Sequence, residues 1–432
     1  MSSNLLLPKK RYVEVAVDSA TDGGKTCVYY VDPSPAWLTT ATHGWTPTGI
    51  VPQLPVELLY TIVLQSDRHQ LPTLALVSRV FCSAAQRLLF KDVPLVTLPR
   101  LIGLLSILAS CPLLASFVRT LVIRTTSTLG LLDGFYILLS RALHHTSNLK
   151  ELEIHIGGSH PKYLRGCAFR LKDLIIEAEW NAYTSNWVEE QSELECFSFI
   201  GPHSEYKAMR RDALPKLRRV SGPPMMLVTL VPGRPVERVQ VNLAHPIFFN
   251  SGVLGNLSRA LAFSTSLVSD LCVLIRNTSG ITTTLDTWEI IDALNVIPEA
   301  IPNLQAFSLV TGSCFINRGI LTGIGGFVER LPHLKRIDVK SKNKHDSLHD
   351  VVITRQLAEE WHKRCKTLKT VGLPGDLWIL HRHLGWISAQ ARSEEILKQV
   401  KRLQDRLDAT LRVEVSGSNA VATLVEHNHD AE

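Results

Sequence analysis

The sequence predicts an α/β chain in which a short N-terminal helical bundle is followed by a solenoid of alternating helices and strands and by a C-terminal helix. The observations behind this prediction are an apolar pattern that recurs along most of the chain and helical spacing of apolar residues near both ends. The chain has 432 residues, of which 45% are hydrophobic and 20% charged. This balance is typical of globular proteins and excludes wholesale disorder.

A β-hairpin is predicted over residues 11–31. Val13, Val15 and Val17 alternate as in a strand, residues 21–24 form a turn, and residues 27–31 return. The turn contains Gly-Gly-Lys-Thr, but an upstream glycine of a phosphate-binding loop is lacking, so the hairpin is the better interpretation. A proline-rich linker follows, and we assign residues 1–50 to hairpin and linker.

Helical spacing begins near residue 54. Apolar residues recur three and four positions apart in two runs, Leu58, Leu59, Ile62 and Val63, then Leu74, Val77, Phe81, Ala84 and Leu88. The pattern predicts a bundle of two or three helices, which we assign to residues 51–95.

One apolar trio then recurs, with two residues between its first and second members and one between its second and third. The complete trios are Val118/Leu121/Ile123, Leu149/Leu152/Ile154, Leu171/Leu174/Ile176, Leu194/Phe197/Phe199, Val236/Val239/Val241, Val268/Leu271/Val273, Leu304/Phe307/Leu309, Leu334/Ile337/Val339 and Leu368/Val371/Leu373. A degraded trio stands at Leu217/Val220, where Gly222 holds the third position.

Each trio predicts a helix that passes through a tight turn into a strand, because its last two members share one strand face. The middle positions lie 19 to 36 residues apart, and several trios share flanking Pro or Asn residues, which argues against chance recurrence. The pattern resembles leucine-rich repeats. We therefore assign residues 96–385 to a leucine-rich-repeat-like solenoid, with helices expected near 131–143, 285–301, 320–331 and 357–368.

The C-terminal region, residues 386–432, contains a narrow apolar stripe. Ile396, Val400, Leu403 and Leu407 recur at spacings of four, three and four, which predicts a helix over about 393–412. The stripe is too short for a coiled coil, so we expect this helix to pack on its own chain and cover the last open edge of the solenoid.

The helical region near the N-terminus resembles the F-box, in the form common in fungal F-box proteins with a leucine-rich C-terminal region. The motif reads Leu-Pro-Val-Glu-Leu-Leu from Leu54 and Leu-Val-Ser-Arg from Leu76, ending in Leu-Leu-Phe at Phe90. The family often has Trp where Phe81 stands. The resemblance covers roughly residues 51–93 at the level of the motif and the solenoid at the level of architecture, and it leaves the hairpin unassigned.

This resemblance implies a substrate receptor that links a target protein to a Skp1-type adaptor and, through it, to a cullin-RING ubiquitin ligase. The residues that it places at the adaptor interface are Leu54, Pro55, Leu58, Ile62, Val77 and Phe81. Surplus apolar surface is expected of so small a bundle. The alternatives are a bundle that only caps the solenoid and a ligase-independent scaffold for protein–protein interaction.

Two basic segments, residues 205–219 and 335–344, are candidate substrate-binding surfaces. Arg218 and Arg219 lie between Leu217 and Val220 of the degraded trio, and Lys335 and Arg336 lie between Leu334 and Ile337 of another trio. We therefore expect both pairs at equivalent places on their repeats. Grouped Arg and Lys could bind an acidic or phosphorylated segment. The alternative is ordinary solvated surface.

No catalytic, cofactor or metal motif appears, so we expect a protein that is not an enzyme and has neither cofactor nor metal. His362 and Cys365 share a helix face, but two ligands do not complete a zinc site.

A net charge of +6 is too small to predict nucleic-acid binding. The uncharged run from Leu101 to Val118 contains Pro112 and favours a helix and strand over a membrane span. Widely spaced cysteines and no secretory signal predict a cytoplasmic or nuclear location.

Overall fold

The fold is described from a computed structural model, in which the chain divides into two compact units, Met1–Val220 and Ser221–Glu432. The residues that the structure describes are 14–18, 25–29, 55–94, 97–125, 131–156, 161–201, 209–244, 249–276, 287–312, 316–341, 351–390, 393, 398 and 401–404.

The N-terminal hairpin is present. Strands β1 (Glu14–Asp18) and β2 (Lys25–Tyr29) pair antiparallel, with Ala16 opposite Cys27. The expected turn residues and the linker after the hairpin lie outside the described residues.

The predicted helical bundle consists of α1 (Val56–Gln65), the short 3-10 helix η2 (Arg68–Gln70), α2 (Leu71–Ala75) and α3 (Arg79–Lys91). Pro55 precedes α1, where its missing N–H costs no helical hydrogen bond. The backbone N–H of Phe81 donates to the Ser78 hydroxyl at the start of α3. Arg68 donates to the Leu89 and Asp92 carbonyls and so ties η2 to the end of α3.

The remaining strands of the described residues form a 13-stranded open sheet whose order follows the chain from β3 to β15. In the first unit the strands are β3 (Asp92–Val93), β4 (Thr120–Arg124), β5 (Glu151–His155), β6 (Asp173–Glu177) and β7 (Cys196–Ile200), and β3 to β7 pair in parallel. β8 (Arg219–Gly222) spans the division between the units.

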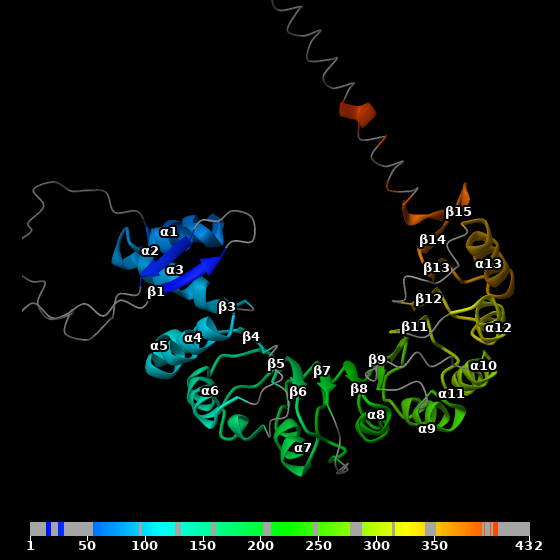
Figure 1. The fold of residues 1–432 in the computed structure, drawn as a ribbon, viewed down its shortest axis with the longest axis horizontal. Helices are drawn as coiled ribbons and strands as arrows, with labels where there is room; N and C mark the ends of the chain where they lie inside the picture. The colour runs from blue at the N-terminus through cyan, green and yellow to red at the C-terminus, as the bar shows by residue number, and fades with distance from the viewer. Residues whose placement is uncertain are drawn as a thin grey trace, which may run out of the picture. The chain divides into compact units, whose positions relative to one another are not determined.

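The helices of the first unit that follow the bundle lie along one side of its strands (Figure 1). They are α4 (Leu98–Ser110), α5 (Pro112–Ala115), α6 (Asp133–His145), the 3-10 helix η3 (Pro161–Leu164) and α7 (Ala182–Glu189). The apolar run at 101–118 therefore forms helices that lead into β4, as predicted. Pro112 stands at the start of α5, where a proline is tolerated.

The second unit repeats this arrangement. Its strands are β9 (Arg238–Leu243), β10 (Asp270–Ile275), β11 (Ala306–Thr311), β12 (Arg336–Ser341) and β13 (Thr370–Leu373), all paired in parallel. Its helices are α8 (Pro224–Leu230), α9 (Ser251–Ala262), α10 (Thr287–Asn295), α11 (Ile297–Ala300), α12 (Arg318–Glu329) and α13 (Val351–Arg364).

The apolar trios supply the core, as the pattern predicts. In the first unit Leu121, Leu152, Leu174 and Phe197 stand opposite one another on successive strands. In the second unit the same register joins Val239, Leu271, Phe307, Ile337 and Val371. All apolar members of the ten trios are buried, and so is Gly222 at the degraded position. A shift of one residue would turn these side chains to the opposite face, so burial fixes the register.

The far edge of the second unit differs from the prediction. β13 is followed by two antiparallel strands, β14 (Asp376–His381) and β15 (Gly385–Ser388), with Trp378 and Trp386 buried. Residues 401–404 are helical, but Leu403 is 58% exposed. The expectation that Leu403 packs against the chain is therefore wrong. Ile396, Val400 and Leu407 lie outside the residues whose side chains are described.

Candidate functional site

The helical bundle has a small core. Its buried members are Val63 of α1, Leu71 of α2, and Ala84 and Ala85 of α3. Partly buried residues packed against them are Tyr60, Leu74, Ala75, Phe81, Leu88 and Leu89. Two of the four buried residues are alanines, so the bundle buries little apolar volume for its size.

Helix α1 carries exposed apolar side chains beside its buried face. Val63 is fully buried and faces α3, whereas Leu58 and Ile62, four residues apart, are 50% and 43% exposed. Residues four apart lie on one face of a helix. A surface helix normally carries polar residues on its outer face, so this exposed apolar face is a candidate contact surface.

The connection from α2 to α3 exposes a second group of apolar side chains. Leu76 is 65% exposed, Val77 is 64% exposed and Val80 is 42% exposed. The Ser78 cap fixes the backbone here, because its hydroxyl accepts from the first turn of α3. These exposed side chains therefore stand on an ordered turn. We call Leu58, Ile62, Leu76, Val77 and Val80 the apolar surface of the bundle.

The sequence predicted part of this surface. Leu58, Ile62 and Val77 are exposed as an interface requires, and Pro55 is exposed at the start of α1. Phe81 is different, because its side chain is partly buried and packs against the bundle core, and its contribution to an adaptor interface stays a prediction. Leu54 lies outside the described residues.

Sequence reasoning missed Leu76 and Val80 as surface residues. Helical phase gives only a weak signal: Phe81, Ala84, Ala85 and Leu88 form the inner stripe of α3, and Val80, one turn before Ala84, lies at the edge of that stripe. Its exposure of 42% therefore follows from the packing of the bundle and not from the sequence pattern alone. Leu76, which precedes the Ser78 cap, lies before α3 begins and carries no such signal.

The two basic pairs occupy equivalent places, as predicted. The backbone N–H groups of Arg218 and Arg219 both donate to the Glu195 carbonyl, and those of Lys335 and Arg336 both donate to the Gln305 carbonyl. The same arrangement, in which one carbonyl accepts from two successive backbone N–H groups, recurs at the starts of β5, β6, β7, β10, β11 and β13. Each pair thus consists of the first residue of its strand and the residue before it.

The basic side chains have different partners. Arg336 Nε lies 2.6 Å from Asp338 Oδ2, and Lys335 Nζ lies 2.8 Å from Gln305 Oε1. Arg219 Nε donates to Cys196 Sγ at 2.8 Å. Arg218 is exposed and has no side-chain hydrogen bond or ion pair among the described residues. The Arg336 charge is therefore already matched by a carboxylate, and Arg218 is the most available of the four.

A chain of charged side chains crosses the open face of the sheet in the first unit. Glu153 on β5 pairs with Arg124 on β4, and His155 Nε2 lies 2.8 Å from Glu153 Oε1. His155 Nδ1 lies 3.3 Å from Glu177 Oε2 on β6. Burial opposes ionisation of Glu153, but the hydrogen bond and charge of Arg124, with His155, lower the pKa of this carboxyl below its usual value.

The described residues contain no group of three or more His, Cys, Asp or Glu side chains that could hold a metal ion. Cys365 is buried, and His362 Nδ1 lies 3.0 Å from the Leu368 carbonyl oxygen. Both side chains thus take part in local packing at the end of α13. Within the described part of the chain, no helix has the length and apolar character needed to cross a membrane.

Comparison with known proteins identifies no relative: no family model matches the chain, and no curated protein is significantly similar to it.

Proposed function

We propose that this chain is an F-box substrate receptor, in which the bundle of α1–α3 binds a Skp1-type adaptor of a cullin-RING ubiquitin ligase. The helix–strand repeats are proposed to form a leucine-rich-repeat-like solenoid that holds a target protein. The receptor would act by proximity, because it keeps an acceptor lysine near a charged conjugating enzyme and needs no catalytic group of its own. Such a protein works in the cytoplasm or nucleus.

The observation that carries this proposal is the apolar surface of the bundle. Leu58 and Ile62 share one face of α1, and Leu76, Val77 and Val80 stand on the ordered turn before and into α3. Full burial of an exposed aliphatic side chain contributes about 1.5–3 kcal/mol, and these side chains are only 42–65% exposed, so each would add about half of that. A partner that covers several of them would still gain a stable interface. These residues also fall within the F-box-like motif, which a simple cap would not require.

Target binding is proposed for the repeats, with the basic pairs as contacts. Arg218 and Lys335 are the stronger candidates, because both are exposed and neither pairs with a carboxylate among the described residues. Arg336 would have to leave Asp338 before it could bind an acidic group on a target. Apolar side chains on the repeats supply the alternative contacts.

The test is a binding measurement between purified chain and purified Skp1-type adaptor by calorimetry. Leu58→Asp and Val77→Asp place a charge in a contact that would lose water, and each should weaken binding at least about tenfold. Ile137→Asp is the matched control, since Ile137 is 56% exposed on α6, outside the bundle. Circular dichroism would verify that each variant is folded.

Two outcomes would reject the proposal. The first is no binding of the adaptor to the unaltered chain, which favours a ligase-independent scaffold. The second is equal affinity of the adaptor for the unaltered chain and for both folded bundle variants. Loss of binding with Leu58→Asp and Val77→Asp, and not with Ile137→Asp, would support it.

A further inference from the structure

The helices α4, α5 and α6 of the first unit carry few charges. Among the residues of these three helices, Asp133 is the one acidic residue, and Arg100 and Arg141 are the basic ones apart from two histidines. Large apolar side chains are exposed instead, among them Ile102 on α4 and Ile137 on α6. Because the outer face of a surface helix is normally rich in charged residues, this surface is a candidate interface.

Three exposed residues of α6 form a stripe that reads acidic, apolar and basic. Asp133, Ile137 and Arg141 are spaced four residues apart, so they lie on one face of the helix, about 6 Å apart along its axis. Neither Asp133 nor Arg141 has a side-chain hydrogen bond or an ion pair among the described residues. The helix dipole favours an acid in the first turn and a base near the last, but it does not account for the exposure of Ile137.

The two ends of α6 have complementary shapes. At the start of the helix, Leu132 is 82% exposed at the N-cap, a position that polar residues normally hold. The Phe135 N–H donates to the Leu132 carbonyl at 2.9 Å, so the backbone that presents this side chain is ordered. Toward the other end lies an open pocket of about 390 Å³. Its lining residues are Ala109 of α4 and Ile137, Ser140, Arg141, His144 and His145 of α6.

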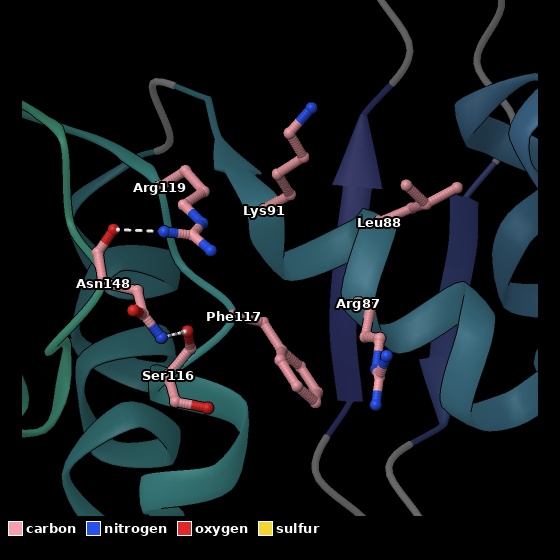
Figure 2. A pocket seen from close by; sticks show the side chains of 7 residues that line it. All are labelled: Arg87, Leu88, Lys91, Ser116, Phe117, Arg119 and Asn148. Carbon is pink, nitrogen blue, oxygen red and sulfur yellow. Dashed lines mark hydrogen bonds between the residues drawn. The ribbon is translucent and has the colours of Figure 1, made fainter.

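The pocket between the end of α3 and the start of β4 has no comparable order. Its lining includes Arg87, Lys91 and Arg119, but Figure 2 shows the Arg87 guanidinium beyond Phe117 and the Lys91 ammonium pointing the opposite way. Arg119 Nη1 donates to the Asn148 carbonyl at 3.1 Å. These cations have no common centre at which one ligand could contact all three.

We infer that α6 forms the centre of a two-fold dimer interface with a second copy of this chain. The two α6 helices lie antiparallel, with the symmetry axis at Ile137, which meets Ile137 of the second copy. Asp133 then lies opposite Arg141 of the second copy, and Arg141 lies opposite Asp133 of the second copy, because both residues are four positions from the axis. Leu132 enters the pocket of the second copy, and this contact also forms twice.

Self-complementarity favours a second copy over an unrelated partner. A two-fold interface needs one surface patch that matches itself in reversed direction, and a stripe of acid, apolar residue and base meets this condition. A projecting leucine and a pocket at opposite ends of α6 meet it as well. A membrane surface fits less well, because anionic lipids would repel Asp133. None of these residues belongs to the apolar surface of the bundle, so the dimer interface is distinct from the proposed adaptor interface.

The test is sedimentation velocity of the full chain over a range of concentrations. The unaltered chain should form dimers as its concentration rises. Asp133→Arg and Arg141→Asp each place like charges opposite each other, so each should weaken self-association at least about tenfold. An equimolar mixture of the two variants should dimerise again, because one chain then carries two cations in the stripe and the other carries two carboxylates. Lys363→Asp, which changes an exposed cation on α13, should leave self-association unchanged.

Leu132→Ser tests the pocket contact. Serine is a good N-cap, so α6 should stay folded while the dimer weakens. An unaltered chain that stays monomeric at every concentration would overturn the inference, and so would a dimer that both charge variants and Leu132→Ser leave intact. A mixture of the charge variants that stays monomeric would also reject the antiparallel pairing. Because monomeric variants keep the apolar surface of the bundle, their affinity for the adaptor should be unchanged, and the two proposals can fail separately.

Discussion

Asp338 on β12 and Gly372 on β13 stand opposite each other, and the carboxylate of Asp338 occupies the space that a Cβ atom at residue 372 would need. Asp338 is buried, its Oδ2 accepts from Arg336, and its Oδ1 has no hydrogen-bond partner among the described residues. The carboxylate therefore fits on this strand because its neighbour has no side chain.

Gly372→Ala should destabilise the protein by about 1–3 kcal/mol, because the new methyl group would displace a buried and charged side chain. Gly326→Ala is the control, since Gly326 lies in α12 and no atom outside its own helix lies within reach of an added Cβ. That change should be neutral or stabilise by up to about 1 kcal/mol. Urea unfolding of both variants measures the difference, and equal stabilities would contradict the packing described.

Glu153→Gln should reduce stability in a manner that depends on pH. The pKa of Glu153 is lower in the folded chain than in the unfolded chain, so its contribution is present above the unfolded value and is lost as pH falls through the folded value. At pH 7 the loss should be about 1 kcal/mol, given that Arg124 is half exposed. The stability difference between the two proteins should shrink as pH falls through the lowered pKa of Glu153, and a difference that persists in stronger acid would show that packing is responsible.

The β14–β15 hairpin should stabilise the end of the sheet. Trp386 is buried, and its ring centre lies 5.8 Å from that of His362 on α13. Truncation after Leu384 should therefore lower the melting temperature by several degrees, whereas truncation after Gln390 should have little effect. Trp386→Ala in the full chain should reproduce most of the first effect. Equal melting of the two truncated chains would show that residues 385–390, and with them β15, do not stabilise the sheet.

The sequence predicted the parallel strands well, because each trio encodes its strand face and register directly. The end of the sheet was not predicted: residues 376–388 have no trio, and their tryptophans become buried only through contacts with β13 and α13. The stripe containing Leu403 shows the limit of amphipathic patterns, since periodicity defines an apolar face without identifying what covers it.

The candidate sites were predictable to different degrees. Helical phase is sufficient to group Leu58 with Ile62, because the two lie four residues apart on one face of a single helix. Helical phase could not predict the pocket that Arg87 and Arg119 line. Arg87 and Arg119 are far apart in the sequence, and only the pairing of β3 with β4 brings them to one cavity. The partners of Arg219 and Arg336 likewise depend on strand geometry.

Within each unit, every parallel strand pairs only with strands that precede or follow it directly in the chain. Under mechanical tension such a sheet should therefore come apart one strand at a time from its free edge, with each step releasing one helix and its strand. The resisting force would be small and nearly constant, because adjacent parallel strands separate by successive loss of a few hydrogen bonds. This graded yielding contrasts with the abrupt rupture expected when distant parts of a chain are joined across a closed barrel.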